Sequence, residues 1–401
     1  MLAIRLAGSL VLLAILLAGA QAFALPAPDT LPAALAELPG ADLVFFDEPQ
    51  PGQPSRVLLA ARTKAPLARL RAVLVDPGAY QRAVPSFRRA EVLGRQGGNV
   101  EIEWELEVPL WNLEGKLWLR PAADGVDLQL VEGDLAPGLF QLRTREAKGG
   151  VVLSLTGQAN MREANWATKR LVKRSPLAEP AMTATAAWVL LRALVLEAER
   201  PGAALDPRRR PAAGPSPPAL AALDGSALAR LARGRLGPGQ AMAAVRPRPD
   251  GRLDRIEVAA LARFPAAAVQ KALGEGTRWQ ALPGWHKVMP RPGPPPTTLW
   301  EVDSRFPFVD FDAVWSIRPG PPLRGQVVGG DARGAVLGWD VVDGGAPQTA
   351  VAVLSLHPRL ETSGYIPRKF IEAEPLLEHG LALGVAYVDA VSLLRALQGK
   401  Q

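Results

Sequence analysis

The chain has 401 residues, 48% of them hydrophobic, and a formal net charge of +7. This length allows two domains of about 100–200 residues, and the composition excludes a chain that is disordered throughout. Because there is no cysteine, disulfides, thiol nucleophiles and cysteine metal sites are excluded. The arginines are spread along the chain without a base-stacking or helix-turn-helix pattern, so we expect no nucleic-acid partner.

Residues 1–24 have the layout of a secretory signal peptide. Arg5 precedes an apolar run from Leu6 to Ala20, and Ala22 and Ala24 offer small residues at the cleavage positions. We predict cleavage near Ala24 and a periplasmic or secreted product, which N-terminal sequencing would test. The alternative is an uncleaved segment that anchors the protein in the inner membrane, since no charge appears between Arg5 and Asp29.

The rest of the first half, residues 30–200, has the pattern of a strand, a helical stretch, a meander of strands and a closing helix. The most regular strand is 101–108, where apolar residues alternate with glutamates, as in an antiparallel strand with one solvated face. The closing helix is apolar nearly all round and must be covered on most sides. The expected strands are 56–61, 101–108, 116–121, 126–131, 139–143 and 151–155, and the expected helices are 65–83 and 181–198.

Residues 201–219 are rich in proline and contain Arg208-Arg209-Arg210. This composition is typical of a stiff, solvated linker. We expect the two halves to be autonomous, with few contacts between them, so limited proteolysis should cut first between Arg208 and Arg210.

The second half, residues 220–398, repeats the first. Segment 306–319 matches segment 108–121 at a constant offset of 198, and further matches follow in the same order. The second half is expected to have strands near 256–260, 300–306, 313–318, 326–328, 335–342 and 350–356 and a closing helix over 375–397. The matched pairs are Pro109 with Pro307, Arg120 with Arg318, Pro121 with Pro319, Gly133-Asp134 with Gly330-Asp331, and Glu179-Pro180 with Glu374-Pro375.

This order of elements resembles the START-like (SRPBCC) superfamily, including its polyketide cyclase/dehydrase-like and coenzyme-Q-binding-protein-like members. The resemblance rests on the turns Ala65-Pro66 and Phe264-Pro265, on Val131 to Asp134, on Ser363 to Pro367 and on Ala227 to Arg233. It implies an α+β fold of two tandem helix-grip domains, each a bent antiparallel sheet wrapped around a long C-terminal helix. It also implies a hydrophobic cavity between sheet and helix in each half.

Residues expected on the inner face would line such a cavity. We favour the second half as the binding half, because the first has Asn165-Trp-Ala-Thr where the second keeps Gly-x-x-Pro. Replacing Gly384 with Phe is expected to fill the pocket and leave the fold intact. The predicted lining residues are Trp104, Leu117, Leu128, Phe140, Trp188, Trp300, Phe306, Trp315, Trp339, His379 and Gly384.

No pattern indicates a cofactor or a metal site. The histidines His286, His357 and His379 fall on three different elements, which does not favour zinc. No phosphate-binding glycine motif or nucleophile elbow is present. His379 is either a core residue or a cavity group that binds a polar head or acts as a base.

The sequence therefore predicts an exported protein that binds a lipid-, quinone- or polyketide-like molecule. One alternative is a cyclase or dehydratase, which a pKa-shifted carboxylate or histidine facing the cavity would favour. Another is a structural module with collapsed cores. Peripheral contact with an anionic membrane through Lys169 to Arg174 and Arg368 to Phe370 is a further option, against an ordinary solvated helix start.

Overall fold

The computed structural model describes residues 25–47, 53–108, 111–201, 224–237, 239–248, 252–282, 285–306, 309–359, 369, 371–372, 374–397 and 399. The predicted signal peptide, most of the predicted linker and the loop from Ser363 to Pro367 lie outside the described residues. The described chain folds as two helix-grip units, one in each half, which confirms the predicted α+β class.

The first half contains the expected meander, together with two strands that were not predicted, Asp42–Phe46 at its start and Phe87–Gln96 within it. Its elements are η1 (Pro28–Thr30), α2 (Leu31–Glu37), β1 (Asp42–Phe46), β2 (Arg56–Thr63), α3 (Leu67–Val75), α4 (Pro77–Ala83), β3 (Phe87–Gln96), β4 (Asn99–Val108), β5 (Trp111–Ala122), β6 (Gly125–Gly133), β7 (Gly138–Ala147), β8 (Gly150–Gln158), α5 (Trp166–Arg174) and α6 (Ala178–Glu199).

The second half repeats this order, and α7 and β9 take the places of α2 and β1. Its elements are α7 (Ser226–Ala232), β9 (Ala241–Pro247), β10 (Leu253–Ala262), α8 (Ala266–Leu273), η3 (Gly276–Ala281), β11 (Trp285–Pro292), β12 (Thr298–Phe306), β13 (Val309–Arg318), β14 (Leu323–Gly330), β15 (Val336–Asp343), β16 (Ala350–His357) and α10 (Leu377–Leu397).

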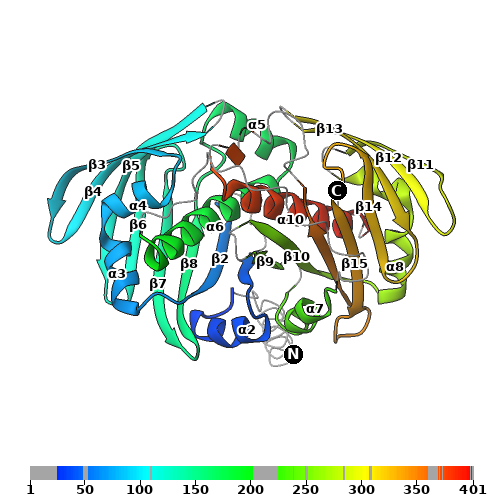
Figure 1. The fold of residues 1–401 in the computed structure, drawn as a ribbon, viewed down its shortest axis with the longest axis horizontal. Helices are drawn as coiled ribbons and strands as arrows, with labels where there is room; N and C mark the ends of the chain where they lie inside the picture. Colours follow the sequence, from blue (N-terminus) through cyan, green and yellow to red (C-terminus); the bar gives the residue numbers. More distant parts are fainter. Residues whose placement is uncertain are drawn as a thin grey trace, which may run out of the picture.

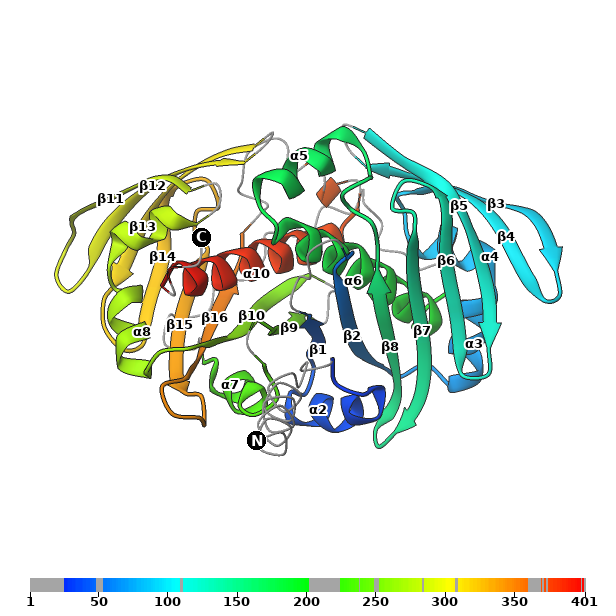
Figure 2. The same ribbon diagram turned by 180° about the vertical axis from the view of Figure 1, so that it is seen from behind.

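The closing helices α6 and α10 lie side by side against one face of the sheet, with α2 and α7 at the opposite side of the molecule (Figures 1 and 2). The central strands are covered on both faces. Val44 and Phe46 of β1 face the core that contains α6 and α10. Leu43 and Phe45 face a second core formed with α2 and α7. Both closing helices are long and apolar enough to cross a bilayer, but most of their length is buried in the protein.

All sixteen described strands form one continuous antiparallel sheet, because β1 of the first half pairs with β9 of the second. Val44 lies opposite Ala243. These two residues are also equivalents, since Leu43 pairs with Ala60 in the first half as Met242 pairs with Ala259 in the second. A pseudo-twofold axis therefore passes between β1 and β9.

The closing helices meet across the same axis. The Thr185 hydroxyl shares its one proton between the carbonyl oxygens of Gly380, at 2.7 Å, and Ala181, at 2.9 Å. A Cβ atom on Gly380 would lie 2.7 Å from the Thr185 methyl group, so glycine permits this close approach. The expectation that few contacts join the halves is wrong, because sheet and helices are continuous across the axis.

Two local motifs occur in both halves. The Tyr80 hydroxyl donates to the carbonyl of Leu74 at 2.8 Å, and the Trp279 indole donates to that of Leu273 at 3.0 Å. Each bond joins the second, shorter helix of the stretch to the last turn of the first helix. In both Gly-Asp segments the aspartate carboxylate accepts a hydrogen bond from a backbone N–H of the neighbouring strand, β5 in the first half and β13 in the second. Those bonds run from Glu114 to Asp134 at 3.1 Å and from Asp312 to Asp331 at 3.2 Å.

Candidate ligand-binding site

The predicted inner-face residues lie in the apolar core between the sheet and the helices. Strand alternation places them there, since every second side chain points to the same face. Phe306 ends β12, and its side chain lies outside the described residues. Those buried in this core are Trp104, Leu117, Leu128 and Phe140 in the first half and Trp300, Trp315 and Trp339 in the second.

Tryptophans of the second half form a cluster that the sequence reasoning did not predict. Trp279 of η3 packs edge-on against Trp300, with ring centroids 5.2 Å apart, and against Trp339 at 6.3 Å. Trp279 was missed because a short 3-10 segment has no periodicity that assigns a face. The available signal was the alignment of Trp279 with Tyr80, the equivalent residue of the first half. The cluster joins β12, β15 and the helical stretch into one aromatic wall.

Three inner-face tryptophans have a buried indole N–H without a hydrogen-bond partner in the described part of the chain. They are Trp104, Trp315 and Trp339, and each is at most 6% exposed. A buried donor without an acceptor costs about 1–3 kcal/mol. These positions are therefore places where an acceptor atom would be stabilising.

Trp339 also lines a cavity of about 260 Å³ in the second half. The cavity lies between α8 and β15, at the point where β14 begins. It is bordered by α8 rather than by the closing helix α10, and among the predicted lining residues Trp339 alone borders it. Its walls are formed by Ser226, Gln270, Leu273, Gly320 to Leu323 and Trp339 to Val342.

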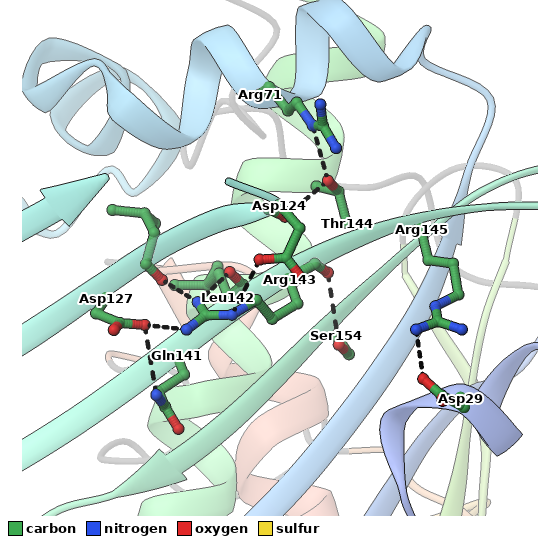
Figure 3. Close-up of polar contacts among 11 residues, drawn as sticks. Asp29, Arg71, Asp124, Asp127, Gln141, Leu142, Arg143, Thr144, Arg145 and Ser154 are labelled. Carbon is green, nitrogen blue, oxygen red and sulfur yellow. Dashed lines mark hydrogen bonds and ion pairs between the residues drawn. The ribbon is translucent and has the colours of Figure 1, made fainter. Parts of the chain in front are cut away.

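The two halves differ at the turn that borders the cavity. In the first half, the backbone N–H and hydroxyl of Thr144 both donate to the carbonyl of Asp124, and Arg71 donates to that hydroxyl (Figure 3). This closes the β5–β6 turn onto β7. In the second half β14 pairs with β15 only from Leu323 to Gln326. The remainder of β15 thus borders the cavity.

Trp188, His379 and Gly384 lie at the crossing of the closing helices. The Trp188 and His379 rings stack at 4.8 Å. A Cβ atom on Gly384 would lie 3.3 Å from the Thr185 hydroxyl. The expectation that Gly384→Phe fills a cavity without disturbing the fold is wrong, because this position faces the other helix.

Buried ionisable side chains lie beside the stack of Trp188 and His379. Burial raises the pKa of Asp42 to about 6, against the opposing charge of Arg192, whose nearest nitrogen is 3.8 Å from the carboxylate. Burial, with the positive charge of Arg192, lowers the pKa of His379 to about 3. His379 is therefore neutral at physiological pH. Its ring interacts with the Arg252 backbone, but neither ring nitrogen forms a hydrogen bond of good geometry with the described residues.

The two equivalent glutamates, Glu179 in the first turn of α6 and Glu374 just before α10, are also buried, but their partners differ. Glu179 pairs with Arg162 at 2.8 Å within the first half. Glu374 accepts the backbone N–H and hydroxyl of Ser86, which belongs to the other half. Burial raises the pKa of Glu374 to about 7. None of Asp42, Glu374 and His379 lines the cavity beside Trp339.

The three histidines remain apart in the structure. His286 is exposed on β11, whereas His357 on β16 and His379 on α10 are buried. Within the described ranges, no group of His, Asp and Glu has the arrangement of a metal site.

No protein-family model matches the chain, and no curated protein matches its sequence. Among solved structures, TTHA0849 from Thermus thermophilus is 15% identical and matches 36% of this chain and 96% of its own, with a TM-score of 0.31. The Zhui aromatase/cyclase from Streptomyces sp. R1128 is 17% identical over 36% of this chain and 93% of its own, with a TM-score of 0.29.

The di-domain ARO/CYC StfQ from the steffimycin biosynthetic pathway matches more of the molecule. It is 10% identical and covers 83% of this chain and 98% of its own, with a TM-score of 0.26. These scores are too low to support an argument. The helix-grip assignment rests instead on the strand order and the two closing helices.

Proposed function

We propose that the protein binds a small hydrophobic molecule that carries a hydrogen-bond acceptor, and that the second half holds the primary site. The proposal rests on the position of Trp339 at the cavity and on its buried indole N–H. Trp339 lines a cavity of about 260 Å³, and its buried indole N–H has no acceptor among the described residues. A bound oxygen atom would satisfy that donor and remove its desolvation cost.

The chemistry of the walls favours a mostly apolar ligand. Leu273, Leu323 and Trp339 give an apolar lining, and Gln270 offers an amide that already donates to the Val341 carbonyl at 3.4 Å. Small-molecule sites are usually about 300–1,000 Å³ and combine apolar walls with a few polar groups. The cavity is slightly below that range, so a ring system or short chain fits this proposal better than a complete lipid.

Two alternatives remain. A cyclase or dehydratase would need an acid or base beside the ligand, and the shifted groups Asp42, Glu374 and His379 lie elsewhere. A structural module would have no ligand at all. We further propose that the halves arose by duplication and that the protein is exported after removal of residues 1–24.

Native mass spectrometry of protein purified from its own host tests the proposal, followed by titration with a fluorescent fatty acid, a quinone and a sterol. We expect a retained molecule or saturable binding of one probe. Val341→Phe, which adds volume at the cavity wall, should abolish that binding. Val131→Phe is the matched control, because Val131 is exposed in the first half.

Two results would contradict the proposal. One is the absence of both a retained molecule and probe binding in the folded protein. The other is binding that survives Val341→Phe unchanged in a variant whose unfolding midpoint matches that of the wild type.

A further inference from the structure

Helix α5 is a short cationic helix with an exposed aromatic residue at its first position. Trp166 is 61% exposed, the largest exposure among the exposed large hydrophobic residues of the described chain. The cations of the helix, Lys169, Arg170, Lys173 and Arg174, are exposed as well. Helix α5 lies on the side of the molecule away from α2 and α7 (Figures 1 and 2).

The helical repeat gathers these side chains on one face. Residues three and four apart are neighbours on a helix, so Trp166 adjoins Lys169 and Arg170, which adjoin Lys173 and Arg174. Thr168 is buried, and Val172 packs on the main core from the other side of the helix. The outward face therefore consists of a tryptophan and four cations, which we call the α5 face.

The helix is held in place at its start. The Asn165 side chain accepts the backbone N–H of Thr168 at 3.0 Å, as an N-cap residue does. Because the helix is capped and packed, its exposed cations are presented together rather than on a flexible loop.

The charge of the α5 face is largely unneutralised. The helix contains no acidic residue. Lys169 lies 3.5 Å from Glu163, while Arg170, Lys173 and Arg174 form no ion pair within the described part of the chain. The face thus lacks the alternation of signs that is usual on a solvated helix.

We propose that the α5 face docks on an anionic lipid surface. Clustered Lys and Arg are attracted to negatively charged headgroups, and tryptophan favours the membrane–water interface because its ring is apolar and its N–H is polar. Docking needs no ligand, so it is independent of the proposed function. It requires that α5 lie flat on the headgroups with Trp166 at their depth.

The test is sedimentation with vesicles of phosphatidylcholine alone or with phosphatidylglycerol at about 30%. The chain beginning at Leu25 is used, so that residues 1–24 cannot insert. We expect binding to the anionic vesicles only, weakened by added salt because exposed charges are screened. The double variant Lys173→Gln and Arg174→Gln should bind about 25-fold more weakly, at roughly fivefold for each cation.

Arg95→Gln with Lys148→Gln is the matched control, since both residues are exposed cations of the first half outside α5. It removes the same charge and should leave binding within about threefold of the wild type, because distant charges are screened. Trp166→Ala should weaken binding in moderate salt, where the cations contribute less. Circular dichroism and unfolding midpoints establish that each variant is folded.

The proposal is overturned if anionic and neutral vesicles bind equally, or if the α5 variant and the control lose binding to the same degree. It is also overturned if vesicles fail to bind while single-stranded DNA binds in an α5-dependent way, which would assign the face to nucleic acid. Ligand binding is measured separately, so failure of either proposal can be told from failure of the other.

Discussion

Asp127 on β6 and Arg324 on β14 occupy equivalent places in the two halves and carry opposite charges. Asp127 pairs in register with Gln141, as Arg324 pairs with Gly338. Asp127 binds Arg143 at 2.6 Å, and Arg324 binds Asp340 at 2.9 Å. The same cross-strand ion pair is thus present in both halves with its charges exchanged (Figure 3 shows the first).

The guanidinium makes the same backbone contacts from either strand. In each half its Nη1 donates to two carbonyl oxygens, one on each strand of the pair. The acceptors of Arg143 are Val126 at 3.1 Å and Leu142 at 2.9 Å, and those of Arg324 are Leu323 at 3.0 Å and Trp339 at 3.2 Å.

The two pairs should differ in their contribution to stability because their burial differs. The Arg324 and Asp340 side chains are 10% and 17% exposed, against 26% and 29% for Arg143 and Asp127. We expect Asp340→Asn to lower the free energy of unfolding by about 2 kcal/mol, since it weakens a charged hydrogen bond to a buried group. Asp127→Asn should cost less than about 1 kcal/mol. Equal losses in urea unfolding would contradict this difference.

The shared sheet predicts that the two halves unfold together. Separating them would expose the edges of β1 and β9 and the contact faces of α6 and α10. We therefore expect a single calorimetric transition, with a ratio of calorimetric to van't Hoff enthalpy near one. Cleavage of the predicted linker between Arg208 and Arg210 should leave two fragments that remain associated. Two resolved transitions, or fragments that separate and stay folded, would show that the halves are independent.

The helix crossing should be intolerant of added atoms at Gly380. The Thr185 hydroxyl is held between two carbonyl oxygens, so its methyl group cannot easily move away from a new Cβ atom. We expect Gly380→Ala to destabilise the protein by about 1–3 kcal/mol through overpacking, despite the better helix propensity of alanine. Gly384→Ala is the comparison, and its looser 3.3 Å contact should make it nearly neutral. Equal urea unfolding midpoints for the two variants would contradict this interpretation.

Because His379 is buried in its neutral form, we expect the protein to lose stability as the pH falls below 6.5. Its pKa is about 3 in the folded protein, against an ordinary value of 6.5, so the unfolded chain binds a proton first as the pH falls below 6.5. By pH 5 this favours unfolding by about 2 kcal/mol. His379→Phe keeps a ring against Trp188 and removes two buried nitrogens that lack well-formed hydrogen bonds, so it should stabilise the protein at pH 8 and by about 2 kcal/mol more at pH 5.

The measurement is the difference between variant and wild type in urea unfolding at the two pH values. Asp42 and Glu374 have raised pKa values and lose stability as the pH rises, which is the opposite direction. Their contributions cancel in the difference. A gain that is the same at pH 5 and pH 8 would mean that His379 is not buried in its neutral form.

The elements that the sequence predicted are those in which the apolar residues follow a clear pattern. Alternation over 101–108 predicted β4, and a run apolar on all sides predicted α6. The edge strands β3 and β11 were missed, and so were β1 and β9, because both faces of β1 and β9 are buried and no alternation marks them. Their pairing joins distant segments of the chain, and its register depends on tertiary packing.

The sequence predicted only part of the candidate site, because strand alternation does not reveal how the elements pack together. Alternation placed Trp339 on the inner face. The cavity lies where β14 begins to pair with β15, and the residues of these two strands do not indicate that point. Gly384 and His379 were assigned to the cavity because a helix that is apolar all round does not reveal which side faces the sheet and which faces another helix.

The most direct test of the account is calorimetric titration of the best-bound probe into wild type and Trp339→Phe, with Trp104→Phe as the matched control. Both tryptophans are buried donors without a partner among the described residues. Loss of the Trp339 N–H should weaken binding about five- to tenfold, the equivalent of one hydrogen bond, without lowering the unfolding midpoint. Trp104→Phe should bind as the wild type does. Unchanged affinity in Trp339→Phe, or an equal loss in Trp104→Phe, would contradict the assignment of the site to the second half.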